Sequence, residues 1–374
     1  MWEPQGIFAK YMQNQPVIFQ GEEALIGLNN FPGSRIAVIS GSGFGTDQKD
    51  LLKSVFKKRQ LEFVKKSWNG EPELNQLTGT VRELENLRPD VIIAAGGGSV
   101  IDGVKLCRVL YEFPYIFDKD VRMGQMIFST KFIAVPTTVG SGAEASSAAV
   151  YYDPKNRCKR MLVNQALRPD VIVMNPSLIR NSPLCLVASS SADMMAHALE
   201  GYVSTIKNPL ADMIAENCIH TIHEEFDKND LISMDFQRLQ YAGYLGGIVQ
   251  NECLVGVTHA VAHQMTAGGI SHSAAVSFLL PYTIRMHEAE QSSADRLEML
   301  SHHAGFESVS ELLHLSERLY LLSEQDKDVC VSFLRENADS EEFISNVMQD
   351  PGGKGNPVPL TEDYIKGFIG EILK

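Results

Sequence analysis

Short apolar runs alternate with amphipathic stretches through the first half of the chain. Stretches of helical period at residues 48–59 and 73–87 separate the apolar runs. Strands are predicted at 35–40, 61–64, 91–95 and 132–136. Continuous apolar strands that alternate with helices of this length are typical of a parallel sheet with both faces covered. The first half is therefore predicted to be an α/β domain.

From residue 191 onward the pattern changes to long helical periodicities with almost no β-branched runs. Breaks in these helices are expected at Asn208–Pro209 and at Pro281. A chain of 374 residues is longer than one hydrophobic core usually grows, which favours two domains. Ser182–Pro183 marks the change of pattern. We predict an α/β domain over residues 1–182 and an all-helical domain over 183–374.

Charge and composition limit the partners that the chain can have. The formal net charge is −13, the pI is near 5.3 and no cluster of Lys and Arg stands out, so neither nucleic acid nor an anionic membrane surface is expected to bind. The N-terminus lacks the features of a signal peptide, and no stretch approaches the ~20 apolar residues of a membrane span. The six cysteines form no CxxC pair, which is typical of reduced thiols. A cytoplasmic protein is predicted.

Potential metal ligands occur in two groups in the helical half. Asp193 and His197 are four residues apart, as are His259 and His263, and His272 follows. Side chains four residues apart lie on one face of a helix and can reach the same ion. One carboxylate with several imidazoles suits Zn²⁺ or Fe²⁺, and no Cys pair lies nearby as in a structural zinc site. Each residue alone is more often solvated or hydrogen-bonded, but together they predict a metal site.

Two loops rich in glycine and hydroxyl groups follow predicted strands. In the first, residues 96–99 run from a strand into a helix expected to begin near Val100, so that the backbone can approach a diphosphate. This loop does not have the GxGxxG spacing of the usual dinucleotide fingerprint. The second loop covers residues 136–144. Either loop alone is equally consistent with a plain turn, whereas two loops at neighbouring strand ends indicate one ligand crevice.

Five motifs occur in a fixed order along the chain, namely GGGSVID, PTTVGSGAE, SADMMAHALEGY, GVTHAVAH and SHSAAVSFLLPY. In this order the chain resembles the iron-containing (group III) alcohol dehydrogenases, which are relatives of glycerol dehydrogenase and dehydroquinate synthase. The resemblance covers nearly the whole chain. It implies a dehydroquinate synthase-like fold, in which a Rossmann-like parallel sheet binds the dinucleotide and an all-α C-terminal domain binds the metal. It further implies a metal-dependent, NAD(P)-linked oxidoreductase of a small alcohol or aldehyde. Members of the family are often dimers, so the resemblance also implies a homodimer.

The resemblance also implies roles for individual residues. The metal ligands would be Asp193, His197, His259 and His272. The residues that contact NAD or NADP would be Gly96, Gly97, Gly98, Ser99, Asp102, Thr137, Thr138, Ser141 and Lys159. His263 would lie near the substrate, and we interpret it as a proton relay because imidazole titrates near neutral pH. The alternative role for His263 is to orient a metal ligand.

Some positions differ from the family pattern and bear on specificity. After the first predicted strand the family often carries an acidic residue for the adenosine ribose. This chain has Gly41 and Ser42 there, which we predict to contact the cofactor, so the choice between NAD and NADP stays open. Positions that line the family's substrate pocket are Ala148, Gln250 and Gly352 here, and Lys354 adds a cation to the same C-terminal loop. These residues favour a polar substrate such as a polyol, a sugar or a sugar acid with a terminal hydroxyl or aldehyde group.

Other functions stay open at this point. A lyase like dehydroquinate synthase also uses NAD and a metal, although the first ligand there is a Glu and the pocket is rich in Lys and Arg. A metal-dependent hydrolase without a redox role and a catalytically silent cofactor-binding protein are further alternatives. The sequence does not distinguish iron from zinc, and it does not name the substrate or the direction of the reaction.

Overall fold

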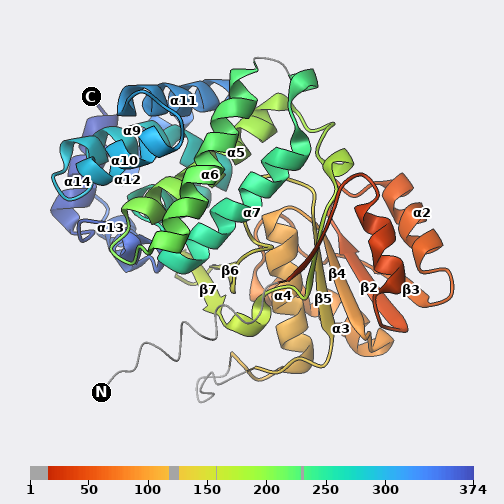
Figure 1. The fold of residues 1–374 in the computed structure, drawn as a ribbon. Helices are drawn as coiled ribbons and strands as arrows, with labels where there is room; N and C mark the ends of the chain where they lie inside the picture. The colour runs from red at the N-terminus through yellow and green to blue at the C-terminus, as the bar shows by residue number, and fades with distance from the viewer. Residues whose placement is uncertain (1–15, 118–125, 157, 229–230) are drawn as a thin grey trace, which may run out of the picture. The chain divides into compact units, whose positions relative to one another are not determined.

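The computed structural model describes residues 16–117, 126–156, 158–228 and 231–374. These residues form two compact units (Figure 1). The first unit contains residues up to Thr137 together with Ala143–Tyr152 and Arg160–Leu178, and the second contains Thr138–Gly142, Asp153–Lys159 and Ile179–Lys374. The sequence predicted one division after residue 182 and did not anticipate the two short segments that pack within the second unit.

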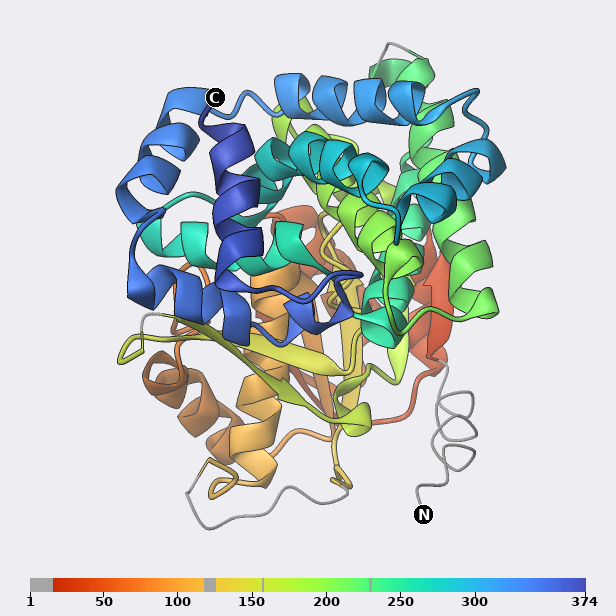
Figure 2. The same ribbon diagram turned by 90° about the vertical axis from the view of Figure 1, so that its left-hand side faces the viewer.

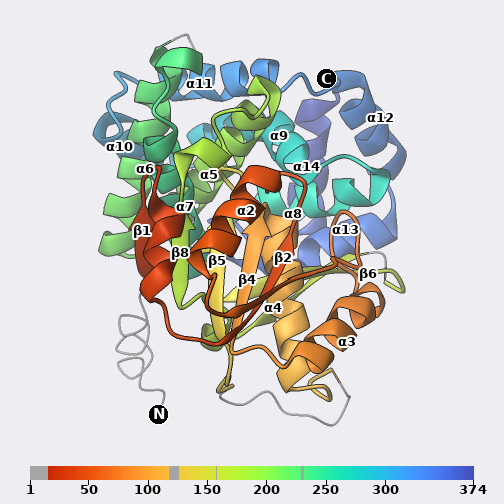
Figure 3. The same cartoon turned by 90° about the vertical axis from the view of Figure 1, so that its right-hand side faces the viewer.

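The first unit is built on a six-stranded sheet in the order β1-β8-β5-β4-β2-β3. All of its strand pairs are parallel. Figure 3 shows β1, β8, β5, β4 and β2 side by side in this order. The strands are β1 (Val17–Gln20), β2 (Arg35–Ser40), β3 (Gln60–Val64), β4 (Val91–Gly96), β5 (Lys131–Pro136) and β8 (Val171–Met174). A separate pair consists of β6 (Ala148–Asp153) and β7 (Cys158–Val163).

Both faces of this sheet are covered, which explains why its central strands are apolar throughout. Ile92 and Ala94 of β4 share a buried cluster with Val104 of α4, whereas Ile93 alternates with them and is equally buried. In Figures 1 and 3, α4 and α2 lie on opposite sides of the strands. The helical segments of this unit are η1 (Ala24–Asn30), α2 (Thr46–Val55), η2 (Leu74–Leu77), α3 (Thr78–Leu87), α4 (Gly98–Glu112), η3 (Gln165–Leu167) and η4 (Pro176–Leu178).

The second unit is helical from residue 179 onward, and no strand occurs there among the residues that the structure describes. Its helices are drawn from green to blue in Figure 2. Every residue of α5 from Val187 to Val203 is buried, so α5 is the central helix of this unit. The segments are α5 (Leu184–Val203), α6 (Pro209–Asp227), η5 (Leu231–Ser233), α7 (Phe236–Cys253), α8 (Val257–Met265), η6 (Thr266–Gly268), α9 (His272–Ala289), α10 (Ala294–His303), α11 (Val309–Leu322), α12 (Lys327–Asn337), α13 (Glu341–Gln349), η7 (Gly352–Gly355) and α14 (Glu362–Ile372).

The predicted fold class, a parallel α/β sheet followed by a helical region, is confirmed. Several details of the prediction were wrong. The helix expected at 48–59 is Thr46–Val55, the one expected at 73–87 begins with the 3₁₀ turn η2, and α4 begins at Gly98 rather than near Val100. Pro281 does not interrupt a helix but lies inside α9. A proline removes only one backbone donor, and the tertiary packing of a buried helix can compensate for that loss.

Two other expectations concern thiols and membranes. All six cysteines are free, and four of them are buried. Within the described part of the chain, no helix has the length and apolar character needed to cross a bilayer.

Candidate metal centre and cofactor loops

The four predicted metal ligands of the second unit lie around one carboxylate oxygen. Asp193 and His197 come from α5, His259 from α8, and His272 is the first residue of α9. Oδ1 of Asp193 is 3.8 Å from Nε2 of His197 and 3.4 Å from Nε2 of His259. It is 3.5 Å from Nε2 of His272. The spacing of four residues places the first two side chains on the same face of α5, and the tertiary fold supplies the other two.

The ligand atoms of Asp193, His197 and His259 all lie within 4.8 Å of one another. The rings of His197 and His259 are stacked with their centroids 4.6 Å apart, and the ring of His272 is 5.5 Å from that of His259.

This centre fits a cation because it leaves buried polar atoms without partners. Neither Oδ1 of Asp193 nor Nε2 of His259 has a hydrogen-bond partner among the described residues, although both are buried. Each unsatisfied buried polar atom costs about 1–3 kcal/mol. A divalent cation coordinated by these atoms would remove that cost, and the set of one carboxylate and three imidazoles suits Fe²⁺ or Zn²⁺.

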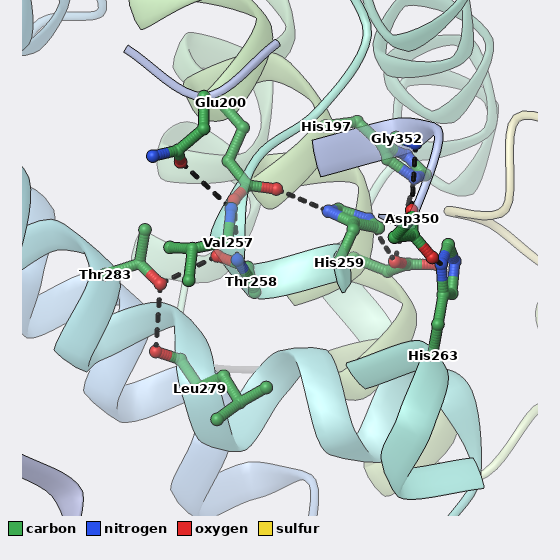
Figure 4. A network of polar contacts seen from close by, with 12 residues as sticks. His197, Glu200, Val257, Thr258, His259, His263, Leu279, Thr283, Asp350 and Gly352 are labelled. Atoms are coloured by element: carbon green, nitrogen blue, oxygen red, sulfur yellow. Dashed lines mark hydrogen bonds and ion pairs between the residues drawn. The ribbon is translucent and has the colours of Figure 1, made fainter. Parts of the chain in front are cut away.

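A carboxylate behind the centre orients His259. Nδ1 of His259 lies 2.5 Å from Oε2 of Glu200, and the backbone N–H of Thr258 donates to Oε1 of Glu200 over 2.8 Å (Figure 4). The proton between them therefore sits on Nδ1, which leaves Nε2 as the coordinating atom. Sequence reasoning missed Glu200. Its position three residues after His197, on the same face of α5, was the available signal.

The electrostatics of the centre favour ligands that are ready for a cation. Burial lowers the pKa of His197 to about 4, so this imidazole is neutral near pH 7. Burial raises the pKa of Asp193, but the neighbouring His197 and His259 lower it more, and the net shift is downward. For His259, burial lowers the pKa, whereas the neighbouring carboxylates of Asp193 and Glu200 raise it to about 9. A proton held by His259 would have to leave when a metal binds.

His263 is paired with a second carboxylate that the sequence did not reveal. Nδ1 of His263 lies 2.7 Å from Oδ2 of Asp350, and the backbone N–H of Gly352 donates to Oδ1 of Asp350 over 2.8 Å (Figure 4). The ring of His263 stacks on that of His272 with centroids 5.1 Å apart. The structure thus brings the predicted residues His263 and Gly352 together through Asp350, beside the metal ligands.

In the first unit, the carboxyl ends of β2, β4 and β5 meet. The backbone N–H of Thr137 donates to the carbonyl of Gly96 over 3.1 Å. A Cβ at Gly41 would lie 3.9 Å from Cα of Gly96, and one at Gly43 would lie 2.8 Å from Oγ1 of Thr137. Three of the predicted cofactor-binding positions therefore converge at one edge of the sheet, where α/β proteins bind their ligands.

The first loop leads directly into α4. Gly97 is the N-cap in an extended conformation and provides no side-chain cap, so the amides of Gly98 and Ser99 face the space where an anion would bind. Asp102, one turn further along, accepts a hydrogen bond from the backbone N–H of Val150 over 3.2 Å. The Asp102 carboxylate is thus already engaged by the protein on one oxygen.

The remaining predicted positions are distributed over the two units. Thr138, Ser141 and Lys159 belong to segments of the second unit. Buried Lys159 contributes, after burial itself, to lowering the pKa of His272. The predicted substrate positions Gln250, Gly352 and Lys354 belong to the second unit and Ala148 to the first. Their roles stay predictions.

The second loop packs closely on helices of the second unit, which leads to a prediction about stability. Gly140 has φ +106°, and a Cβ there would lie 2.1 Å from the carbonyl oxygen of Ser190 in α5. We expect Gly140→Ala to lower the free energy of unfolding by roughly 3 kcal/mol or more, because backbone strain adds to the overlap. Urea unfolding would measure this. Gly70→Ala is the control, since Gly70 has φ +62° but open space around it, and should cost only about 1–2 kcal/mol. Equal losses in both variants would contradict the proposed overlap.

Comparisons with known proteins agree with this architecture. Residues 16–176 match the family model described as iron-containing alcohol dehydrogenase, and residues 187–373 match the model for the C-terminal domain of the Fe-containing alcohol dehydrogenase family. The 1-propanol dehydrogenase PduQ of Salmonella typhimurium is 26% identical over 379 residues, which cover 96% of this chain and 98% of that protein. The NADPH-dependent butanol dehydrogenase of Clostridium saccharobutylicum is 29% identical over 281 residues, which cover 72% of each.

One further relative is matched over a smaller part of its length, and a solved structure shares the fold at low sequence identity. The chain spans 59% of the length of the PduQ protein of Citrobacter freundii, with 30% identity over 233 residues that make up 60% of this chain. An iron-containing alcohol dehydrogenase from Thermococcus thioreducens superimposes with a TM-score of 0.84 at 22% identity, covering 96% of this chain and 98% of that one.

Proposed function

The chain belongs to the iron-containing alcohol dehydrogenase family, whose members are metal-dependent, NAD(P)-linked oxidoreductases, and we infer that it interconverts an alcohol and an aldehyde at the centre around Asp193. The observation that carries this proposal is the single buried carboxylate oxygen with three imidazole nitrogens at 3.4 to 3.8 Å. We propose that Asp193, His197, His259 and His272 hold the metal. The loops around Gly96 and Thr137 would hold NAD or NADP.

The metal ion and the nicotinamide cofactor would supply the Lewis acid and the hydride carrier that amino-acid side chains lack. A divalent cation lowers the pKa of a bound hydroxyl group and polarises a carbonyl, and the nicotinamide accepts or donates the hydride. The chain's own residues orient these groups. Glu200 fixes His259 in one tautomer, and Asp193, His197 and His259 are buried, whereas His272 is partly exposed.

We propose that His263 moves the proton of the substrate hydroxyl. Its Nδ1 is held by Asp350, so Nε2 is the nitrogen that can accept or release a proton. Its stacking on His272 supports a place beside the metal ligands.

For the substrate we propose a polar molecule with a terminal hydroxyl or aldehyde group, such as a polyol, a sugar or a sugar acid. Support comes from the amide of Gln250, whose Oε1 is 3.7 Å from the Cβ position at Gly142, from the small residue Gly352 next to Asp350, and from the exposed cation of Lys354. The names of two relatives specify 1-propanol and butanol, so short alkanols are the competing substrates.

A substrate panel tests this proposal. The enzyme would be loaded separately with Fe²⁺ and Zn²⁺ and assayed for formation of reduced nicotinamide with NAD and with NADP. We expect a higher kcat/KM with at least one polyol or sugar acid than with ethanol, 1-propanol or 1-butanol. A short alkanol that reacts faster than every polar substrate would contradict the substrate class. Failure of every alcohol and aldehyde to change the cofactor's redox state would contradict the dehydrogenase itself and favour a lyase or a hydrolase.

We also propose a homodimer, by analogy with the family, and a cytoplasmic location, from the usage of cysteine. Sedimentation of the purified protein would test the first of these.

A further inference from the structure

A buried lysine of the first unit attaches α4 to the chain that follows the second loop. The side chain of Lys105 has no exposed surface. Its Nζ donates to the carbonyl oxygens of Ala143, Ser146 and Ala148 over 2.6, 3.0 and 2.7 Å. Oγ of Ser146 lies 3.1 Å from Nζ and shares one of these three donors with a carbonyl oxygen. All these acceptors lie within residues 143–148, which begin at the end of the second loop (136–144) and continue past it.

The geometry around Lys105 is that of an ammonium ion. Three carbonyl oxygens can only accept hydrogen bonds, and an ammonium group has three protons to donate, whereas a neutral amine has two. Oδ1 of Asp102 lies 3.5 Å from Nζ and supplies the opposite charge. Oδ2 of Asp102 accepts from the backbone N–H of Val150, so the pair of side chains holds residues 143–150 against one face of α4. A buried charge is tolerated only when it is compensated in this way.

The position of Lys105 relates this attachment to the proposed cofactor site. Lys105 lies seven residues after Gly98, or about 10 Å along the helix whose first turn would receive the diphosphate. At the other end of the loop, Thr137 is bonded to Gly96. The chain is therefore fixed to the β4–α4 segment both where the second loop begins and where it has ended.

We propose that Lys105 is a positioning residue of the dinucleotide site, where it fixes the chain at residues 143–148 against α4, the helix whose first turn would receive the diphosphate. This inference rests on the proposed function, because it presumes that NAD or NADP binds at these loops. The groups that Lys105 contacts belong to residues 143–148 and to Asp102, not to the metal centre, so its loss should weaken cofactor binding and leave the chemistry at the metal centre intact.

The same helix provides a matched control. Arg108, three residues later, is also a buried cation, and it donates to Oγ1 of Thr130 over 3.0 Å. It stacks on Phe128 at 3.9 Å from the ring centroid. Thr130 precedes β5, whereas the second loop follows β5, so Arg108 supports the opposite end of the same strand.

The experiment compares Lys105→Met with Arg108→Met in the metal-loaded enzyme. The dissociation constants of NADH and NADPH would be measured by nicotinamide fluorescence, together with kcat, the KM of the cofactor, metal content and Tm. For Lys105→Met we expect the Kd and KM of the cofactor to rise about tenfold, with kcat and metal content little changed, since small misplacements of binding groups have effects of this order. Arg108→Met should lower Tm and leave the Kd within about twofold.

Two results would overturn the inference. One is an unchanged cofactor Kd in Lys105→Met, and the other is an equal rise in Arg108→Met, which would make the effect one of general destabilisation. If Lys105→Met does not fold, Ser146→Ala removes only the hydroxyl acceptor and should raise the Kd about threefold, because a single hydrogen bond contributes about 1 kcal/mol or less; an unchanged Kd in that variant would also overturn it. Failure of the unmodified enzyme to bind either nucleotide would instead refute the proposed function, together with everything that rests on it.

Discussion

Replacement of His259 by alanine is expected to abolish stoichiometric metal binding and to lower kcat/KM on the order of 10³-fold or more. A bound cation contributes several kcal/mol of transition-state stabilisation, and each 1.4 kcal/mol corresponds to about tenfold in rate. His259 has no exposed surface, and both of its nitrogens face carboxylates, those of Asp193 and Glu200. No other described side chain lies between these two carboxylates, so no neighbouring residue can replace His259 as a metal ligand.

His259→Ala should also destabilise the fold, which makes a control necessary. Removal of one partner from a buried pair costs about 3–5 kcal/mol, because Oε2 of Glu200 is left buried without the imidazole donor. His287 is an equally buried histidine of the second unit, where it lies near Glu290 and Ser293. We expect His287→Ala to lower Tm but to retain metal and activity.

Metal analysis after loading with Fe²⁺ or Zn²⁺, with Tm and kcat/KM on the same samples, distinguishes the two effects. Full metal content and normal turnover in His259→Ala would refute the proposed centre. Loss of metal in both variants would show that the effect on binding follows from instability alone.

The strands and helices that are marked by a local pattern of apolar residues could be predicted from the sequence. β2, β4 and β5 are continuous apolar runs, and the sheet covers them on both faces, so pattern and environment agree. β1 and β8 were missed. Each has four residues, and β1 forms only by pairing with β8, which lies far away in the sequence. A run this short carries no decisive periodicity.

The same distinction applies to the candidate site. Asp193 and His197 were found because a spacing of four residues is a local helical signal. Glu200 and Asp350 were missed, since their partners His259 and His263 lie 59 and 87 residues away. Acidic residues are common on helices and in loops, so the position of Glu200 on the same face of α5 as His197 is only a weak signal, and Asp350 carries no local signal at all.

The second large effect is expected at Asp350, where Asp350→Asn should lower kcat about 100-fold while metal content stays unchanged. Oδ1 of Asp350 accepts from the backbone N–H of Gly352, and Oδ2 accepts from Nδ1 of His263. In asparagine the single oxygen would be taken by the Gly352 amide, so the NH₂ group would face His263. His263 would then accept at Nδ1 and carry its proton on Nε2, which is the wrong tautomer for taking a proton from the substrate.

A carboxylate elsewhere in the second unit serves as the matched control. Asp212 pairs with Arg296 at 2.6 Å, and Asp212→Asn is expected to change Tm with kcat within about twofold of the unmodified enzyme. Steady-state kinetics with a fixed alcohol, and metal analysis of each sample, provide the comparison. A kcat in Asp350→Asn close to that of Asp212→Asn would contradict the role assigned to Asp350.

A double-mutant cycle then separates an action through His263 from a direct one. If Asp350 acts only by holding the tautomer of His263, then Asp350→Asn should have almost no further effect on kcat in the His263→Ala background, because the residue that it orients is gone. If Asp350 instead supports the chain at Gly352 and Gly353, the two losses should multiply, since the backbone contact does not depend on the imidazole. If the fold-losses in kcat of the two single variants multiply in the double variant, Asp350 does not act through His263. If the double variant loses no more kcat than His263→Ala alone, Asp350 and His263 act in the same proton transfer.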